Sequence, residues 1–106
     1  MDMDWNEMSD TAIIKEVGRR IKEYRLKKRF SQQNIAERAG ISMFTVAQIE
    51  KGNPVSIAML IPVLRVLRLL DNLELLLPEI PLSPVEILKL KGKTPKRIRP
   101  PKTINN

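Results

Sequence analysis

The apolar residues of the first part of the chain recur at helical rather than strand spacing. Between residues 11 and 28 they lie three or four positions apart, with charged residues between them: Ile14, Val17, Ile21 and Tyr24. This is the period of an amphipathic helix. The stripe continues to position 25, which is an arginine. We therefore expect Arg25 either to turn outward into solvent or to pair with a buried acid.

Two short helices joined by a turn that contains glycine are predicted next. Ser31 is a favourable N-cap and Gly40 a favourable stop for the first helix, and Ser42 and Gly52 bound the second in the same way. Two helices joined by about three residues form a helix-turn-helix pattern. The small side chain of Ala36 and the glycine of the turn allow the two helices to cross closely.

Residues 56–70 are also helical in spacing, but they are apolar on two faces. One face carries Ile57, Leu60, Ile61, Leu64 and Leu67, and the other Met59, Val63, Val66 and Leu70. Such a helix either dimerises or is covered by its own chain. Pro62 should kink this helix or delay its start. The stretch over residues 71–79 is expected to contain a further short helix, capped by Asp71 and stopped before Pro78.

The net charge of +7 is concentrated at one end of the chain. Residues 1–86 carry twelve Lys/Arg and twelve Asp/Glu, whereas residues 87–106 carry seven basic residues and no acid. Within residues 11–79 the same twelve bases face seven acids. A mildly basic domain with a strongly basic tail favours a polyanionic partner, most simply nucleic acid. The alternative is a tail that is disordered or only aids solubility.

These patterns divide the chain into three parts. Residues 1–10 are expected to be an acidic flexible leader, residues 11–78 a helix-turn-helix DNA-binding domain, and residues 79–106 a basic C-terminal tail. In the tail, Ser83 is a suitable N-cap and Pro84 a suitable first residue for one short helix. No apolar period follows, so residues 92–106 are expected to be flexible.

Several kinds of function are disfavoured by what the chain lacks. It has neither cysteine nor histidine, which removes Cys/His and Ser/His/Asp nucleophiles and most zinc sites. We therefore expect no enzyme, no catalytic residue, no metal and no cofactor. No run approaches the roughly 18 apolar residues of a membrane span, and an acidic start is unlike a signal peptide. A soluble, cytoplasmic protein without a membrane partner is expected. RNA binding is disfavoured because aromatic platforms are scarce.

The helix over residues 43–51 is expected to have a sharply divided surface. At about 100° per residue, Val46 and Ile49 face the core. The opposite side carries Phe44, Ala47, Gln48 and Lys51, with Met43 and Thr45 at its edges. The outward apolar residues either pack against a loop or a dimer partner, or enter a DNA major groove. In a groove, apolar side chains touch thymine methyls and a glutamine pairs with adenine.

An acid that could pair with Arg25 is available on the helix over residues 43–51. Glu50 falls beside its core edge, so an ion pair between Arg25 and Glu50 would join the first helix to the third. A buried pair and two solvated charges remain alternatives. Removing one partner would lower the free energy of unfolding much more for a buried pair than for two solvated charges.

The stretch "RIKEYRLKKRFSQQNIAERAGISMFTVAQIEKG" resembles the DNA-binding domain of the XRE family, which includes the lambdoid phage repressors and Cro. The family pattern is an arginine on helix one, a glutamine opening helix two, an alanine four residues on, a glycine in the turn and a closing Ile/Leu-Glu-x-Gly. Here these are Arg25, Gln32, Ala36, Gly40 and Ile49-Glu50-Lys51-Gly52. The resemblance implies an all-α, five-helix lambda-repressor-like domain that acts as a homodimer on an inverted-repeat operator in double-stranded DNA.

The resemblance also implies residue roles. The base-reading positions are Met43, Phe44, Thr45 and Gln48, with Ala47 at the edge. The phosphate-binding positions are Gln32, Ser42, Lys51 and Asn53. The family more often has polar residues at positions 43 and 44, so here we expect methyl contacts in place of hydrogen bonds. The first hypothesis is thus a dimeric, sequence-specific repressor.

A narrower resemblance concerns residues 55–79 and the tail "SPVEILKLKGKTPKRIR", which are similar to HipB-like antitoxins. It implies a second hypothesis, in which the main activity is binding and neutralising a HipA-like kinase toxin while DNA binding serves autoregulation. The tail would then bind the toxin or add phosphate contacts.

Overall fold

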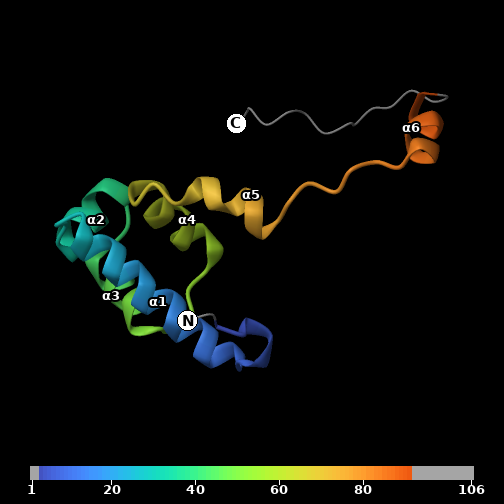
Figure 1. Ribbon diagram of the computed structural model, residues 1–106. Coiled ribbons are helices and arrows are strands. Elements are labelled where there is room, and N and C mark those ends of the chain that lie inside the picture. The colour runs from blue at the N-terminus through green and yellow to red at the C-terminus, as the bar shows by residue number, and fades with distance from the viewer. Residues whose placement is uncertain (1–2, 92–106) are drawn as a thin grey trace. The chain divides into compact units, whose positions relative to one another are not determined.

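The structure is a computed structural model that describes residues 3–91, and within these residues all regular structure is helical (Figure 1). The elements in chain order are η1 (Trp5–Glu7), α1 (Asp10–Lys27), α2 (Gln32–Ala39), α3 (Met43–Lys51), α4 (Ile57–Val66), η2 (Leu70–Asn72), α5 (Leu73–Leu76) and α6 (Pro84–Lys91). The chain divides into two compact units, Met1–Leu76 and Leu77–Asn106. The predicted all-α fold, with five helices before the short helix of the tail, is confirmed.

The ends of the first four helices follow the capping chemistry of the sequence. Each helix is preceded by a serine whose Oγ accepts a hydrogen bond from a backbone N–H three residues on: Ser9, Ser31, Ser42 and Ser56. Gly40 and Gly52 end α2 and α3 in the left-handed region, at φ 73° and 85°. This conformation costs other residues more than it costs glycine. The predicted helix-turn-helix bounds are therefore confirmed.

Helices α1 to α4 surround one apolar core. Its buried members are Ile21, Ile35, Ala36, Val46, Ile49, Val63 and Leu67. We expected Val63 and Leu67 on opposite faces of their helix, which is wrong. Residues four apart share a helix face, and these two are 0% and 1% exposed.

The C-terminal part of the first unit differs from the prediction in three details. Helix α4 begins at Ile57 and runs through Pro62, so the proline does not delay its start. It ends at Val66 rather than at position 70, because Arg68 adopts a positive φ of 62°. Asp71 lies inside η2 and does not cap the next helix, which has only four residues.

In the second unit, α6 begins as predicted. Ser83 Oγ accepts from the Glu86 backbone N–H at 3.1 Å, and a Glu86 carboxylate oxygen accepts from the Ser83 N–H at 2.8 Å. This reciprocal pair is a capping box, and Pro84 occupies the first helical position. The predicted flexible stretch, residues 92–106, lies outside the described residues.

A single glycine, Gly18, allows the backbones of α1 and α3 to come into direct contact where the two helices cross. A Cβ on Gly18 would lie 2.2 Å from the carbonyl oxygen of Ile49 and 3.0 Å from that of Glu50. Any larger side chain would force the two helices apart. The crossing therefore holds the end of α3 directly against α1.

A buried ion pair fixes the same crossing. Arg25 of α1 donates from Nε to Glu50 Oε2 at 2.6 Å and from Nη2 to Oε1 at 3.0 Å, and the two side chains are only 8% and 3% exposed. Arg25 Nη1 also donates to the Phe30 carbonyl oxygen at 2.8 Å. Gln32 Nε2 donates to Glu50 Oε1 at 3.0 Å. The expected pair is thus present, buried, and bonded to the α1–α2 turn and to α2.

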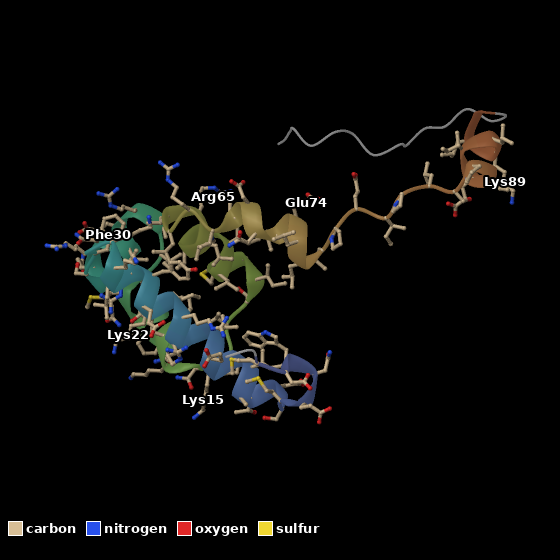
Figure 2. The ribbon with its side chains drawn as sticks, in the orientation of Figure 1. Lys15, Lys22, Phe30, Arg65, Glu74 and Lys89 are labelled. Carbon is tan, nitrogen blue, oxygen red and sulfur yellow. The ribbon has the colours of Figure 1, made fainter. Side chains whose placement is uncertain are left out.

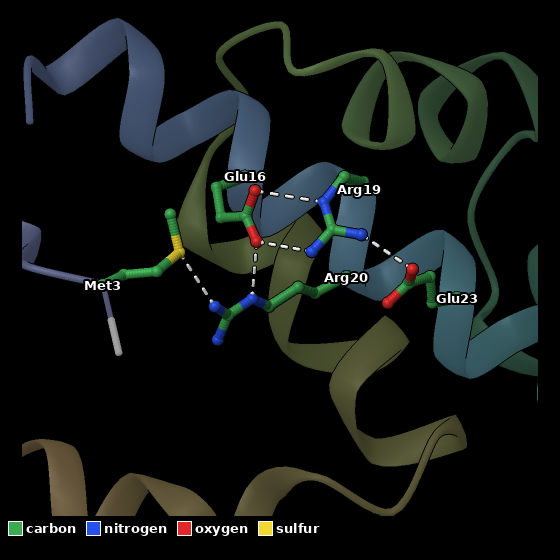
Figure 3. Close-up of polar contacts among 5 residues, drawn as sticks. All are labelled: Met3, Glu16, Arg19, Arg20 and Glu23. Carbon is green, nitrogen blue, oxygen red and sulfur yellow. Dashed lines mark hydrogen bonds and ion pairs between the residues drawn. The ribbon is translucent and has the colours of Figure 1, made fainter. Parts of the chain in front are cut away.

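Residues from the expected leader contact the outer face of α1 (Figure 3). The Arg20 guanidinium lies 4.8 Å from the centre of the Trp5 ring and donates to Met3 Sδ at 3.0 Å. Glu16 accepts hydrogen bonds from both Arg20 and Arg19. These hydrogen bonds lower the pKa of Glu16 to about 2.

We predict that Arg25→Met strongly destabilises the protein. It leaves the Glu50 carboxylate buried without its cation, which costs about 3–5 kcal/mol. For a domain of this size the melting temperature should fall by about 12 °C or more. Lys22→Met, which replaces an exposed cation of the same helix, is the control and should have little effect. A drop of only a degree or two for Arg25→Met would contradict the buried pair.

We predict a pH-dependent contribution from Glu16. Its pKa is about 2 in the folded protein against 4.5 for the unperturbed group, so the folded state favours the charged form. The stabilisation is fully present above about pH 4.5 and is lost as the pH falls toward 2. The melting temperatures of the wild type and Glu16→Gln should therefore differ at pH 7 and converge by about pH 2. A gap that persists unchanged at acidic pH would argue against this assignment.

Candidate nucleic-acid interface

Helix α3 has the divided surface that the sequence predicts. Val46 and Ile49 are 1% and 3% exposed, whereas Phe44 is 71% exposed and Met43 48%. Thr45, Ala47 and Gln48 are partly exposed. All five candidate base-reading residues therefore lie on one nine-residue helix whose opposite side is fixed in the core. Phe44 is the most exposed of the five.

The exposed apolar residues at the start of α3 are not covered by the domain. Large apolar side chains that touch the core from its margin include Phe30, Ile41 and Val55, but neither Met43 nor Phe44. Within the described residues, Phe44 is not packed under a loop, so that alternative from the sequence does not hold. An uncovered phenylalanine on a helix suits contact with another molecule.

Gln48 is oriented by a neighbour that the sequence did not identify. Asn53 donates from Nδ2 to Gln48 Oε1, and the Asn53 backbone N–H donates to the Gln48 carbonyl oxygen at 3.0 Å. The left-handed turn at Gly52 brings the two side chains together. An amide oxygen has two acceptor sites and the amide nitrogen two donors. Gln48 can thus keep this bond and still offer an acceptor and a donor to an adenine edge.

The four candidate phosphate-binding residues flank this surface at the helix ends. Gln32 is the first residue of α2, and its amide already donates one bond to Glu50. Ser42 caps α3, and its hydroxyl also bonds the Thr45 hydroxyl at 2.9 Å. Lys51, the last residue of α3, and Asn53 are exposed. Only Lys51 brings a full positive charge.

Three further cations lie at the end of α1 and in the turn that leads to α2, and the sequence interpretation assigned them no role. Lys27, Lys28 and Arg29 are all exposed. In the sequence they directly precede Phe30, which is labelled in Figure 2 and whose carbonyl oxygen accepts a hydrogen bond from Arg25. The signal in the sequence was the basic run "KKR" immediately before the cap of α2.

Neither a metal site nor a membrane-spanning helix is found in the part of the chain that the structure describes. Among residues 3–91, no three His, Cys, Asp or Glu side chains form a group that could hold a metal ion. None of the described helices is long and apolar enough to cross a membrane.

Comparison with known families agrees with this geometry. Residues 21–70 match the family model described as helix-turn-helix. The match extends from the second half of α1 to the start of η2, and so contains the Arg25–Glu50 pair and all of α3. No curated protein matches the chain. Residues 21–70 thus carry a helix-turn-helix of the XRE type, which is found in DNA-binding regulators.

Proposed function

We propose that the protein is a sequence-specific repressor that reads the DNA major groove with the outer face of α3. The observation that carries this proposal is the exposure of Phe44 beside the oriented amide of Gln48, on a helix anchored through its other side. A major groove about 12 Å wide accepts such a helix. Met43 and Phe44 would contact thymine methyls, and Gln48 an adenine edge. Thr45 and Ala47 complete the contact surface.

The flanking residues would set the register of the helix in the groove. In this proposal Gln32, Ser42, Lys51 and Asn53 bind phosphates at the two ends of α3, and such contacts position the protein without reading bases. Because a carboxylate at position 50 is neutralised by Arg25, it does not repel the backbone. The protein would act in the cytoplasm, at the operator of its own operon.

A homodimer on an inverted repeat is part of the proposal. Two copies would place their α3 helices in successive major grooves about 34 Å apart, and the bound operator would exclude polymerase. Support comes from α4, where Ile57 is 71% exposed and Met59 39%. A second copy could cover these apolar side chains, which one copy leaves in solvent.

A second candidate function is an antitoxin that binds a HipA-like kinase toxin. It is favoured by the apolar side chains that are exposed from α5 to α6: Leu75, Leu76, Leu77, Ile80, Leu82, Val85, Ile87 and Leu88. A run of this kind suits a protein partner. A neighbouring reading frame that encodes a kinase-like protein would favour this candidate, and a solitary gene would weaken it.

We predict that Phe44 reads thymine methyls. Replacing a contacted thymine by deoxyuracil removes only the methyl group, so the wild type should lose affinity for the substituted operator. Phe44→Ala should bind the natural operator more weakly than the wild type does. Replacing the thymine by deoxyuracil should then cost this variant little further affinity. Its melting temperature should be unchanged, because the side chain is 71% exposed. Competition titrations of the two proteins with the two duplexes measure the coupling between the Phe44 side chain and the thymine methyl group. Equal losses for both proteins would rule out methyl contact by Phe44.

We predict that Gln48 discriminates at one base pair of each half-site. A bidentate glutamine–adenine pair is worth about 1–3 kcal/mol of discrimination, so Gln48→Ala should lose about 5- to 150-fold of its preference for adenine there. Asn53→Ala should weaken the same preference, because Asn53 holds the Gln48 oxygen. Gln33→Ala, on the exposed side of α2, is the control. Full base preference in Gln48→Ala would show that another residue reads this position.

A further inference from the structure

Two of the helices are followed, two residues after their last residue, by an arginine in a backbone conformation that favours glycine. Arg29 follows α1 at φ 61°, and Arg68 follows α4 at φ 62°. Helices α2 and α3 place Gly40 and Gly52 at this point. In the left-handed region the Cβ of an L-residue approaches the following carbonyl oxygen. The chain therefore accepts a local strain at each arginine that glycine would relieve.

The strained turn at Arg29 is held tightly in place. The backbone N–H of Arg29 donates to the Leu26 carbonyl oxygen at 2.9 Å, and that of Phe30 donates to the Arg25 carbonyl oxygen at 3.1 Å. The Phe30 carbonyl oxygen accepts from the Arg25 side chain, and the Arg38 guanidinium lies 4.7 Å from the centre of the Phe30 ring. The backbone of Arg29 is thus fixed to the residue that anchors α3.

The side chain of Arg29, in contrast, is exposed and unengaged. Among residues 3–91 no carboxylate forms an ion pair with Arg29 or with the adjacent Lys28. Three peptide units separate Arg29 from Gln32, so their Cα atoms lie within about 11 Å. Gln32, the candidate phosphate-binding residue at the start of α2, already donates one amide N–H to Glu50. Near the start of α2, the cations that remain free to bind a phosphate are therefore Lys28 and Arg29.

We propose that Arg29, supported by Lys28, binds the DNA phosphate backbone beside α2, and that the arginine is retained at φ 61° for this contact. The inference rests on the proposed DNA-binding function and adds a phosphate-binding site to it. Arginine suits this role because its planar guanidinium donates two parallel hydrogen bonds to a phosphate. A fixed backbone lowers the ordering cost of the contact.

The test compares Arg29→Gly with Arg68→Gly in the full chain. The two variants lose the same charge and relieve the same backbone conformation, and Arg68 lines a surface depression together with Arg65, Leu70 and Asp71. Relief of strain should raise the melting temperature of both variants by about 2–6 °C. Binding of a selected operator duplex and of a scrambled duplex is then titrated from about 50 to 200 mM salt.

For Arg29→Gly we expect affinity for both duplexes to fall about tenfold at 150 mM salt, with the preference between them unchanged. The slope of log affinity against log salt should shrink by about 0.9 for each phosphate that the variant no longer binds. Arg68→Gly should keep the wild-type affinity and slope. Higher stability together with weaker binding would separate the phosphate-binding role from a folding defect.

Three results would overturn the inference. If Arg29→Gly binds with wild-type affinity and slope while the wild type prefers the operator, the phosphate contact is wrong although DNA recognition stands. If Arg68→Gly loses as much affinity as Arg29→Gly, the effect is one of net charge alone. If the wild type does not distinguish the operator from the scrambled duplex, the proposed function fails, and the phosphate-binding role of Arg29 fails with it.

Discussion

The buried pair of Arg25 and Glu50 is the interaction on which the geometry of the domain depends. It joins α1 to the last turn of α3, and its remaining hydrogen bonds go to the Phe30 carbonyl oxygen and the Gln32 amide. Four segments therefore meet at one salt bridge. A buried charge is tolerated only when its partners are all in place, so the pair specifies one arrangement of these segments.

This arrangement accounts for the position of α3. The absence of a side chain at Gly18 lets α1 contact the α3 backbone, while Val46 and Ile49 fill the core from the same side. The helix is thus fixed through one side, and Phe44 is left in solvent on the other. A rigidly held helix with an uncovered apolar face is suited to a preformed groove, because little order has to be gained on binding.

Much of this could be predicted from the sequence, because it depends on local chemistry. Serine caps and glycine stops indicated the bounds of α2 and α3, and an arginine in an apolar stripe led to its acidic partner. Other contacts between residues distant in sequence were not foreseen, such as Trp5 with Arg20 and Gln32 with Glu50. The end of α4 was misplaced because no propensity rule places an arginine at positive φ, as Arg68 is. The residue roles at the interface stay predictions.

The central claim is that the outer face of α3 reads double-stranded DNA. Selection of bound duplexes from a random-sequence pool tests it most directly, because no operator has to be assumed. The account predicts an enriched inverted repeat with half-sites about one helical turn apart, containing A·T pairs at the positions facing Phe44 and Gln48. A pool that remains random after repeated selection, or an enriched motif that Gln48→Ala and Phe44→Ala select unchanged, would contradict it.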